Sequence, residues 1–215
     1  MTRSEIIQMF RDECPEITSR VITDTTLQGW CLFGDKRFCA ETRCITDQNG
    51  TEWNTAVNDT NYDLTSKITS FYDIDTWPGS GVLYDGEPIE HATMAELDLD
   101  SYKWRARSAG IPKKWYRRGK YLYLDRPASA VVKVKVFSVL VSDDWNADVA
   151  PFNALDYLEP YHEAMVLYLV MQAKAKIEKP EDAIRSATEY VAYVQWVKKQ
   201  LGGNKGGPVY FRKAV

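Results

Sequence analysis

The chain has 215 residues, of which 45% are hydrophobic and 27% charged. This composition is that of a folded globular protein and excludes a disordered or collagen-like chain. The longest apolar run, Ala164–Met171, is far shorter than the roughly 20 residues that a bilayer-spanning helix needs. Arg3, Glu5 and Arg11 interrupt any signal-peptide core. We therefore expect a soluble protein that is not exported.

The net charge of −3 conceals an uneven distribution along the chain. Residues 1–100 carry 7 Lys and Arg against 19 Asp and Glu, whereas residues 101–215 carry 20 against 11. The basic half contains a stretch with eight cations and no acid: Lys103, Arg105, Arg107, Lys113, Lys114, Arg117, Arg118 and Lys120. Such a stretch attracts an anionic partner, which is either nucleic acid or the acidic half of a neighbouring copy.

Two helices are predicted at the N-terminal end. Residues 4–13 have apolar side chains at helical spacing before Pro15 ends the pattern. A second helix begins with Asp24 or Thr25 as its N-cap and continues to about Thr42, with an apolar stripe formed by Leu27, Trp30, Cys31, Gly34 and Phe38.

From Arg43 to Ser142 the apolar residues alternate with a period of two, which predicts a sheet. The predicted strands are 52–57, 68–74, 82–84, 89–91, 114–117, 121–124 and 131–141. Asp85-Gly86 is typical of a two-residue hairpin turn, and Arg118-Gly119-Lys120 can also reverse the chain. Short connections of this kind favour an antiparallel meander.

The last third is predicted to be a helical hairpin of residues 155–176 and 181–201, with Pro180 starting the second helix and Gly202-Gly203 ending it. The second helix is expected to bury Ile184, Ala187, Val191, Val194 and Leu201. We expect an α+β fold in which helices 1–43 and 151–201 form a small bundle. An antiparallel β domain, 44–150, is inserted between them, and 202–215 form a flexible docking tail.

Catalytic signatures are nearly absent from the sequence. There is no nucleotide-binding glycine loop, nucleophile elbow or H-E-x-x-H motif, and the only histidines are His91 and His162. His162 could act as a general base beside Glu159 or Glu163, but a partly exposed helix residue is the simpler interpretation. The acid pairs Asp73/Asp75, Asp98/Asp100 and Asp143/Asp144 could hold Mg²⁺ if each lies on one strand face. Solvated strand ends and helix caps explain them equally well, so we expect no enzymatic activity.

The four cysteines, Cys14, Cys31, Cys39 and Cys44, are candidates for a zinc site only if all four sulfurs converge on one ion. Their spacing contains no C-x₂-C knuckle, and Cys31 lies on the predicted apolar stripe. Buried reduced thiols are therefore the preferred interpretation, and no cofactor is expected.

The basic stretch is interleaved with Trp104, Trp115, Tyr116, Tyr121 and Tyr123. Aromatic rings among cations are typical of single-strand nucleic-acid platforms, where bases stack and cations hold phosphates. Strands with aromatic residues facing the core and charges facing out produce the same pattern. We prefer a protein interface and keep a nucleic-acid-binding module, residues 103–123, as the alternative.

Several short phrases follow one another in a distinctive order between about residues 60 and 201. They are FYDI at 71–74, GVLYDGEPI at 81–89, GIPKKWY at 110–116, YLYLDRP at 121–127 and LEPYHEA at 158–164. TDTTLQGW at 23–30 adds a weaker match. In this order they resemble the head-to-tail adaptor proteins, also called connector or neck proteins, of tailed bacteriophages. Residues 31–57 have no counterpart in the pattern.

The resemblance implies a structural virion protein of the neck, assembled in the host cytoplasm. Its expected form is a homo-oligomeric ring, usually of twelve subunits, that joins the portal protein to the tail or to a tail-adjacent neck protein. Genomic DNA would pass through the lumen, which the basic stretch could line, and no catalytic step is implied. The resemblance also implies that the C-terminal segment pairs with a neighbouring ring component. The candidate contact residues are Lys205, Pro208, Val209, Tyr210, Phe211 and Arg212.

Overall fold

The computed structural model describes residues 2–47, 49–76, 81–100, 104–141, 159–177 and 179–203. It divides into two compact units. The helical unit comprises Met1–Ile45 and Val141–Val215, and the β unit comprises Thr46–Leu140. Helices and a mixed sheet occupy separate parts of the chain, so the predicted α+β class is confirmed.

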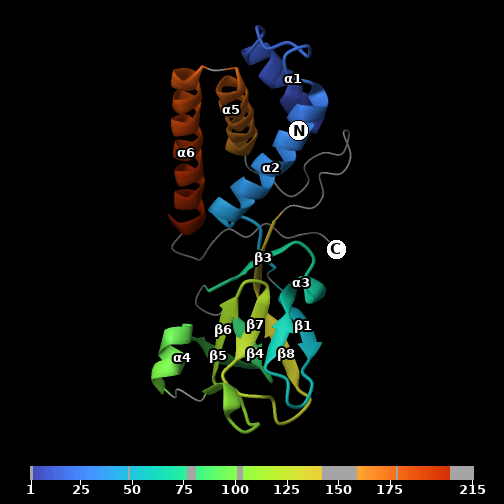
Figure 1. Cartoon of the computed structure of the whole chain (residues 1–215), viewed down its shortest axis with the longest axis vertical. Coiled ribbons are helices and arrows are strands. Elements are labelled where there is room, and N and C mark those ends of the chain that lie inside the picture. The colour runs from blue at the N-terminus through green and yellow to red at the C-terminus, as the bar shows by residue number, and fades with distance from the viewer. Residues whose placement is uncertain are drawn as a thin grey trace. The chain divides into compact units, whose positions relative to one another are not determined.

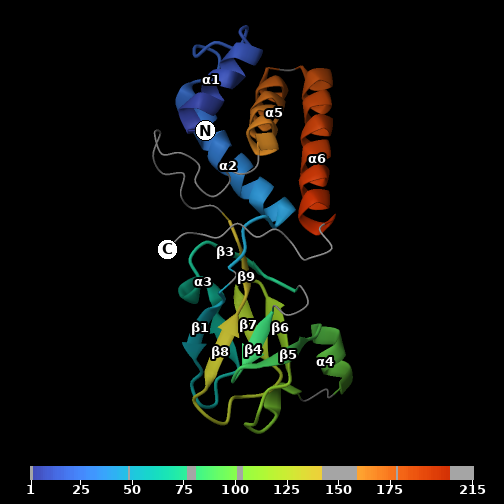
Figure 2. The same ribbon diagram turned by 180° about the vertical axis from the view of Figure 1, so that it is seen from behind.

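The helical unit contains four long helices: α1 (Arg3–Glu13), α2 (Asp24–Thr42), α5 (Glu159–Lys176) and α6 (Pro180–Gly203). α5 and α6 lie side by side and antiparallel in both views (Figure 1, Figure 2). α5 also packs against α1 and α2, so the helix pairs from the two ends of the sequence share one bundle. The predicted bundle is therefore confirmed, although α6 includes Gly202 and Gly203 rather than ending before them.

Local side-chain bonds define the starts of the first two helices. Thr2 and Glu5 form a reciprocal capping box at α1. α2 is capped by Thr23, whose hydroxyl accepts a hydrogen bond from the Thr26 amide, and not by Asp24 or Thr25 as predicted. Thr23 has extended backbone angles that free its hydroxyl for this bond, whereas Asp24 is already helical.

The core of the helical unit is formed by apolar side chains from all four helices. Its fully buried members include Ile6, Phe10, Leu27, Cys31, Phe38, Met165, Leu169, Tyr190, Val194 and Val197. Gly34 permits the close approach of α2 and α5, because a Cβ built at this position would lie 2.6 Å from Cδ1 of Tyr168 and 2.8 Å from Cε of Met165.

The buried face of α6 differs from the predicted one. Val194 is buried as predicted and Ala187 is half-buried, but Ile184 and Val191 are 67% and 49% exposed. Ala183, Ser186, Tyr190 and Val197 face the core together with Val194. Both sets follow helical spacing. The core selects the second set because the large Tyr190 ring fits against Tyr168, with ring centroids 5.7 Å apart.

The β unit contains a seven-stranded sheet of order β1-β8-β4-β5-β6-β7-β2. The strands are β1 (Thr51–Asn54), β2 (Asn61–Asp63), β4 (Val82–Tyr84), β5 (Glu87–His91), β6 (Lys114–Arg118), β7 (Tyr121–Leu124) and β8 (Lys133–Val136). The prediction of an antiparallel meander is wrong in two respects. β5 and β6 run parallel, and several neighbours in the sheet are distant in the chain, because β8 lies between β1 and β4 and β7 pairs with β2. The long connection between β5 and β6, which includes helix α4 (Met94–Asp100) and a 3₁₀ turn (Trp104–Ala106), allows the parallel pairing.

The sheet is strongly curled. β1 and β2 stand at its two ends, yet the rings of Trp53 on β1 and Tyr62 on β2 are only 6.0 Å apart. One core is formed by Tyr62, Val82, Tyr84, Trp115, Leu122, Leu124, Val134 and Val136 of the sheet, together with Leu64, Ile68, Ile74 and Ala128 from outside it. Curling encloses this core with few residues, because one sheet provides both walls.

The two predicted turns are confirmed. Tyr84 pairs with Glu87 across Asp85 and Gly86, both of which have positive φ (54° and 84°). This is the backbone of a type I′ turn, for which Asp-Gly is favoured. Arg118 likewise pairs with Tyr121 across Gly119-Lys120.

Other short elements were not predicted. The predicted strand 131–141 is two strands, β8 and β9 (Ser138–Leu140), and β9 leaves the main sheet to pair with β3 (Phe71–Ile74). Helix α3 (Leu64–Lys67) occupies the stretch before β3, and α4 occupies a segment to which no element was assigned. These elements have only three to seven residues, too few for periodicity to identify them.

Candidate functional site

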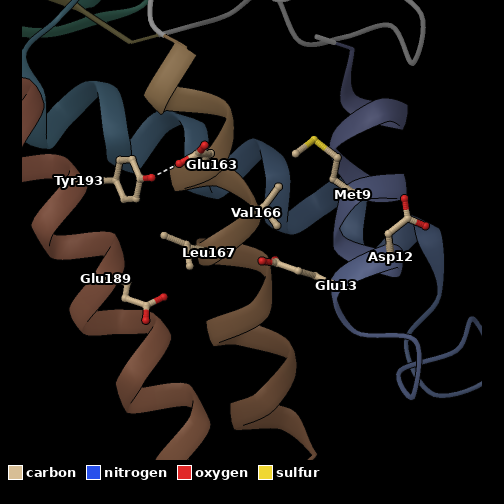
Figure 3. A pocket seen from close by; sticks show the side chains of 8 residues that line it. All are labelled: Met9, Asp12, Glu13, Glu163, Val166, Leu167, Glu189 and Tyr193. Atoms are coloured by element: carbon tan, nitrogen blue, oxygen red, sulfur yellow. Dashed lines mark hydrogen bonds between the residues drawn. The ribbon is translucent and has the colours of Figure 1, made fainter.

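A groove on the helical unit is lined by three helices. α1 contributes Met9, Asp12 and Glu13, α5 contributes Glu163, Val166 and Leu167, and α6 contributes Glu189 and Tyr193. The volume of this acidic groove is about 600 Å³. In Figure 3 the carboxylate of Glu13 points from α1 toward α5, and the hydroxyl of Tyr193 donates a hydrogen bond to Glu163. This bond links α6 to α5 beside the groove.

The lining of the acidic groove has two kinds of surface. Carboxylates provide four of the eight described residues that line it, and none of these eight is Lys, Arg or His. Met9, Val166 and Leu167 provide apolar surface between the acids, and Met9 is 37% exposed. Sequence analysis did not identify this site, because its residues are separated by up to about 180 positions and meet only when the four helices pack.

Four of the eight cations of the basic stretch are paired inside the β unit. Arg107 bonds Asp125 at 3.3 Å, Lys114 bonds Asp100 at 2.5 Å and Lys120 bonds Asp63 at 2.6 Å. Arg117 forms an ion pair with Asp73. Lys113 and Arg118 are exposed, and Lys103 and the side chain of Arg105 lie outside the described part of the chain.

Three of these four acids belong to the acidic first 100 residues. Part of the charge difference between the two halves of the sequence is therefore neutralised within the β unit. In the helical unit, Lys174 bonds Glu16 in the same way, and the pairing raises the pKa of Lys174 and lowers that of Glu16. These pairs leave less charge for contacts with another molecule than the sequence suggested.

The aromatic residues of the same stretch belong mainly to the core. Trp104, Trp115 and Tyr116 are all at least 95% buried. The indole N–H of Trp115 donates to the Ile89 carbonyl oxygen at 3.1 Å, and that of Trp104 donates to Asp98 at 2.8 Å. Tyr121 and Tyr123 are half-buried on β7. The three buried rings therefore offer no face on which a nucleic-acid base could stack, and only Tyr121 and Tyr123 remain partly exposed.

All four cysteines are buried, and none of them forms a disulfide. Three of them belong to α2 or follow its C-terminal end. Burial raises the pKa of Cys31 to about 12 and also raises that of Cys14. Cys39 Sγ lies 3.6 Å from the buried Asp35 carboxylate, and hydrogen bonding with Cys39 lowers the pKa of Cys44. Within the described ranges, no three His, Cys, Asp or Glu side chains form a group that could hold a metal ion.

The residues considered for catalysis are in different places. His91 packs against Trp115 with ring centroids 4.5 Å apart, whereas His162 lies on α5 in the other unit. Asp73 binds Arg117. Asp98 and Asp100 lie on helix α4 and not on a strand, so the one-face argument for these two is wrong. Asp143 and Asp144 lie outside the described residues, as do the candidate tail residues Lys205, Pro208, Val209, Tyr210, Phe211 and Arg212.

Comparison with known proteins identifies one family. The family model of the SU10 adaptor protein matches residues 1–202. The chain therefore belongs to the SU10 adaptor protein family, which supports its assignment as a structural adaptor protein of a bacteriophage. The match includes residues 31–57, for which sequence analysis found no counterpart, and these residues form the C-terminal part of α2 and strand β1.

No curated protein matches the chain. Among the helices of the described residues, none is both long and apolar enough to cross a membrane.

Proposed function

We propose that this protein is a head-to-tail adaptor of the virion neck. In this proposal a ring of about twelve copies joins the portal vertex to the tail, and the genomic DNA passes through its lumen. The observation that carries the proposal is the match of an adaptor family over residues 1–202, almost the whole chain. Since the family acts as structural adaptors, the proposed role requires no catalytic step and no cofactor.

The structure supports a structural role in two ways. The paired cations and buried rings of the stretch 103–123 favour a stable β unit over an exposed nucleic-acid platform. A lumen that DNA must pass through is also expected to bind it weakly, and the pairing of four of the eight cations of the basic stretch fits that expectation.

The test is electron microscopy of the purified chain, alone and mixed with the portal protein of the same phage, with mass photometry of the same samples. We expect rings that stack coaxially on the portal. A chain that forms neither a ring nor a complex with the portal at any salt concentration would contradict the proposal. Tight DNA binding that weakens steeply with salt would favour the nucleic-acid-binding alternative instead.

We also propose that the tail, 204–215, contacts a neighbouring ring component through Lys205, Pro208, Val209, Tyr210, Phe211 and Arg212. Deletion of 204–215 should leave the unfolding transition unchanged and weaken assembly. Pull-down with the portal protein measures the contact with the portal. Sedimentation of the deleted chain alone measures the contact between copies of the chain. Assembly as tight as that of the full chain would contradict this part of the proposal.

A further inference from the structure

The acidic groove has an unusual electrostatic design for a helix bundle. Asp12 and Glu13 are exposed in the last turn of α1, where the partial charge of the helix end is negative. Carboxylates in this position weaken the helix instead of stabilising it. Glu163 and Glu189 add two further exposed acids from the facing helices. The groove is therefore suited to a partner that carries positive charge.

The remaining surface of the acidic groove specifies more than charge. Met9, which is 37% exposed, and the half-buried Leu167 form an apolar strip between the acids, above the buried Val166. Methionine adapts to the shape of its partner and makes favourable contacts with aromatic rings. The matching ligand is therefore a peptide segment that combines cations with aromatic or branched apolar side chains.

The C-terminal sequence of the chain has this composition. Residues 204–215 read NKGGPVYFRKAV, with three cations and no acidic side chain. Val209, Tyr210 and Phe211 are consecutive and are followed directly by Arg212 and Lys213. A guanidinium can bind a carboxylate through two parallel hydrogen bonds, which makes Arg212 a suitable partner for the groove acids.

The distance along the chain favours a segment from another copy. From Tyr193 in the groove, α6 continues for ten residues to Gly203, a rise of about 15 Å. The five residues 204–208 span about 18 Å when fully extended. A tail that turned back into its own groove would need almost complete extension of these residues, whereas the tail of a second copy has no such constraint.

We propose that the acidic groove binds residues 205–213 of a second copy of this chain. The inference rests on the proposed ring and names the component that the tail contacts. Tyr210 and Phe211 pack on the strip of Met9 and Leu167, and Arg212 and Lys213 bind the carboxylates of Asp12, Glu13 and Glu189. Because groove and tail are different surfaces, the contact is head-to-tail and can close into a ring.

The test uses charge-reversed full-length chains. The groove variant carries Asp12→Lys and Glu13→Lys, changes that suit the C-terminal end of a helix and should not unfold α1. The tail variant carries Arg212→Glu and Lys213→Glu. In sedimentation velocity each variant alone should self-associate at least about tenfold more weakly than the wild-type chain. An equimolar mixture should form dimers and stop there, because only one groove and one tail remain intact.

The matched control carries Asp59→Lys and Glu87→Lys, which reverse two exposed acids of the β unit. It should associate like the wild-type chain. Circular dichroism checks that all variants retain the wild-type helix content. A synthetic peptide of residues 204–215 should bind the tail variant, and its affinity for the groove variant should be at least about tenfold lower, as measured by fluorescence anisotropy.

The outcomes separate this inference from the proposed function. If the groove and tail variants still form wild-type rings, the acidic groove does not bind the tail. The proposal that the chain forms a ring is then still supported. If the wild-type chain is monomeric at every concentration, both the ring and the pairing between copies are wrong. A mixture of the two variants that stays monomeric while the wild-type chain assembles also contradicts the pairing.

Discussion

At the scale of single residues, the close contact between α2 and α5 depends on the absence of a side chain at Gly34. Gly34 lies on α2 opposite Tyr168 and Met165 of α5. The Met165 end can move, but the Tyr168 ring is buried and held by its neighbours. Any added atom at position 34 therefore has to displace the ring or separate the two helices.

We predict that Gly34→Ala destabilises the helical unit by about 1–3 kcal/mol, because the new methyl group overpacks the core. The measurement is chemical unfolding followed by circular dichroism at 222 nm. Gly29→Ala on the same helix is the matched control, since no atom lies within 4 Å of a Cβ at Gly29. This control should be neutral or stabilising by up to about 1 kcal/mol, because alanine is the better helix former. Equal effects of the two substitutions would show that packing at Gly34 is unimportant.

The cysteines give a second prediction at this scale. Cys14, Cys31, Cys39 and Cys44 are at most 3% exposed, and burial raises the pKa of Cys31 to about 12. A thiol-specific reagent should therefore label none of them rapidly in the native protein at pH 8, and all four after unfolding. Rapid labelling of a native thiol, counted by mass spectrometry, would contradict the buried positions.

At the scale of elements, ion pairs connect turns that are distant in sequence. Asp63 caps helix α3 through Thr65 and also binds Lys120 in the β6–β7 turn. Lys120, together with Thr65, lowers the pKa of Asp63 to about 2 from its ordinary value of 3.8. The folded state thus holds this carboxylate charged at a pH at which the unfolded chain has already protonated it.

This shift has a defined consequence for stability. Because the folded pKa lies below the unfolded one, the contribution of Asp63 is fully present above about pH 4 and is lost as the pH falls toward 2. We predict that Asp63→Asn flattens the decline of the thermal midpoint between pH 4 and pH 2. Asparagine can still cap α3, so the change isolates the charge. An unchanged pH dependence in the variant would show that the Lys120 pair does not stabilise the fold.

At the scale of the whole molecule, the β unit is a continuous insertion in the helical unit. All strands of both sheets lie between Thr46 and Leu140, and Thr46 forms a β-bridge with Val139. The two ends of the insertion are therefore close together. Its core is composed of its own residues.

We predict that the isolated fragment 46–140 folds by itself, because its core and its hydrogen-bonded sheet remain complete. Circular dichroism should show a β spectrum, and heating should give a single cooperative transition. The same fragment with Val134→Ala is a suitable control. It should unfold at a clearly lower temperature, since Val134 is fully buried. A fragment without a cooperative transition would show that the β unit depends on the helices.

The sequence alone predicted the features that depend on local physics. Helical spacing located α1 and α2, alternation located β6, β7 and β8, and the Asp85-Gly86 pair identified the hairpin turn, because each of these signals lies within a few neighbouring residues. The adaptor resemblance rested on phrases of the same kind, and the family match confirms the adaptor class.

The tertiary structure decided what depends on contacts between distant residues. It selected Tyr190 over Ile184 as the buried side of α6, since both faces satisfy the period and only packing against α5 distinguishes them. It paired the basic stretch with acids up to 57 positions away, and it brought Met9, Glu163 and Glu189 together in one groove. Local spacing carries no information about such pairs, because they form only when the chain is folded.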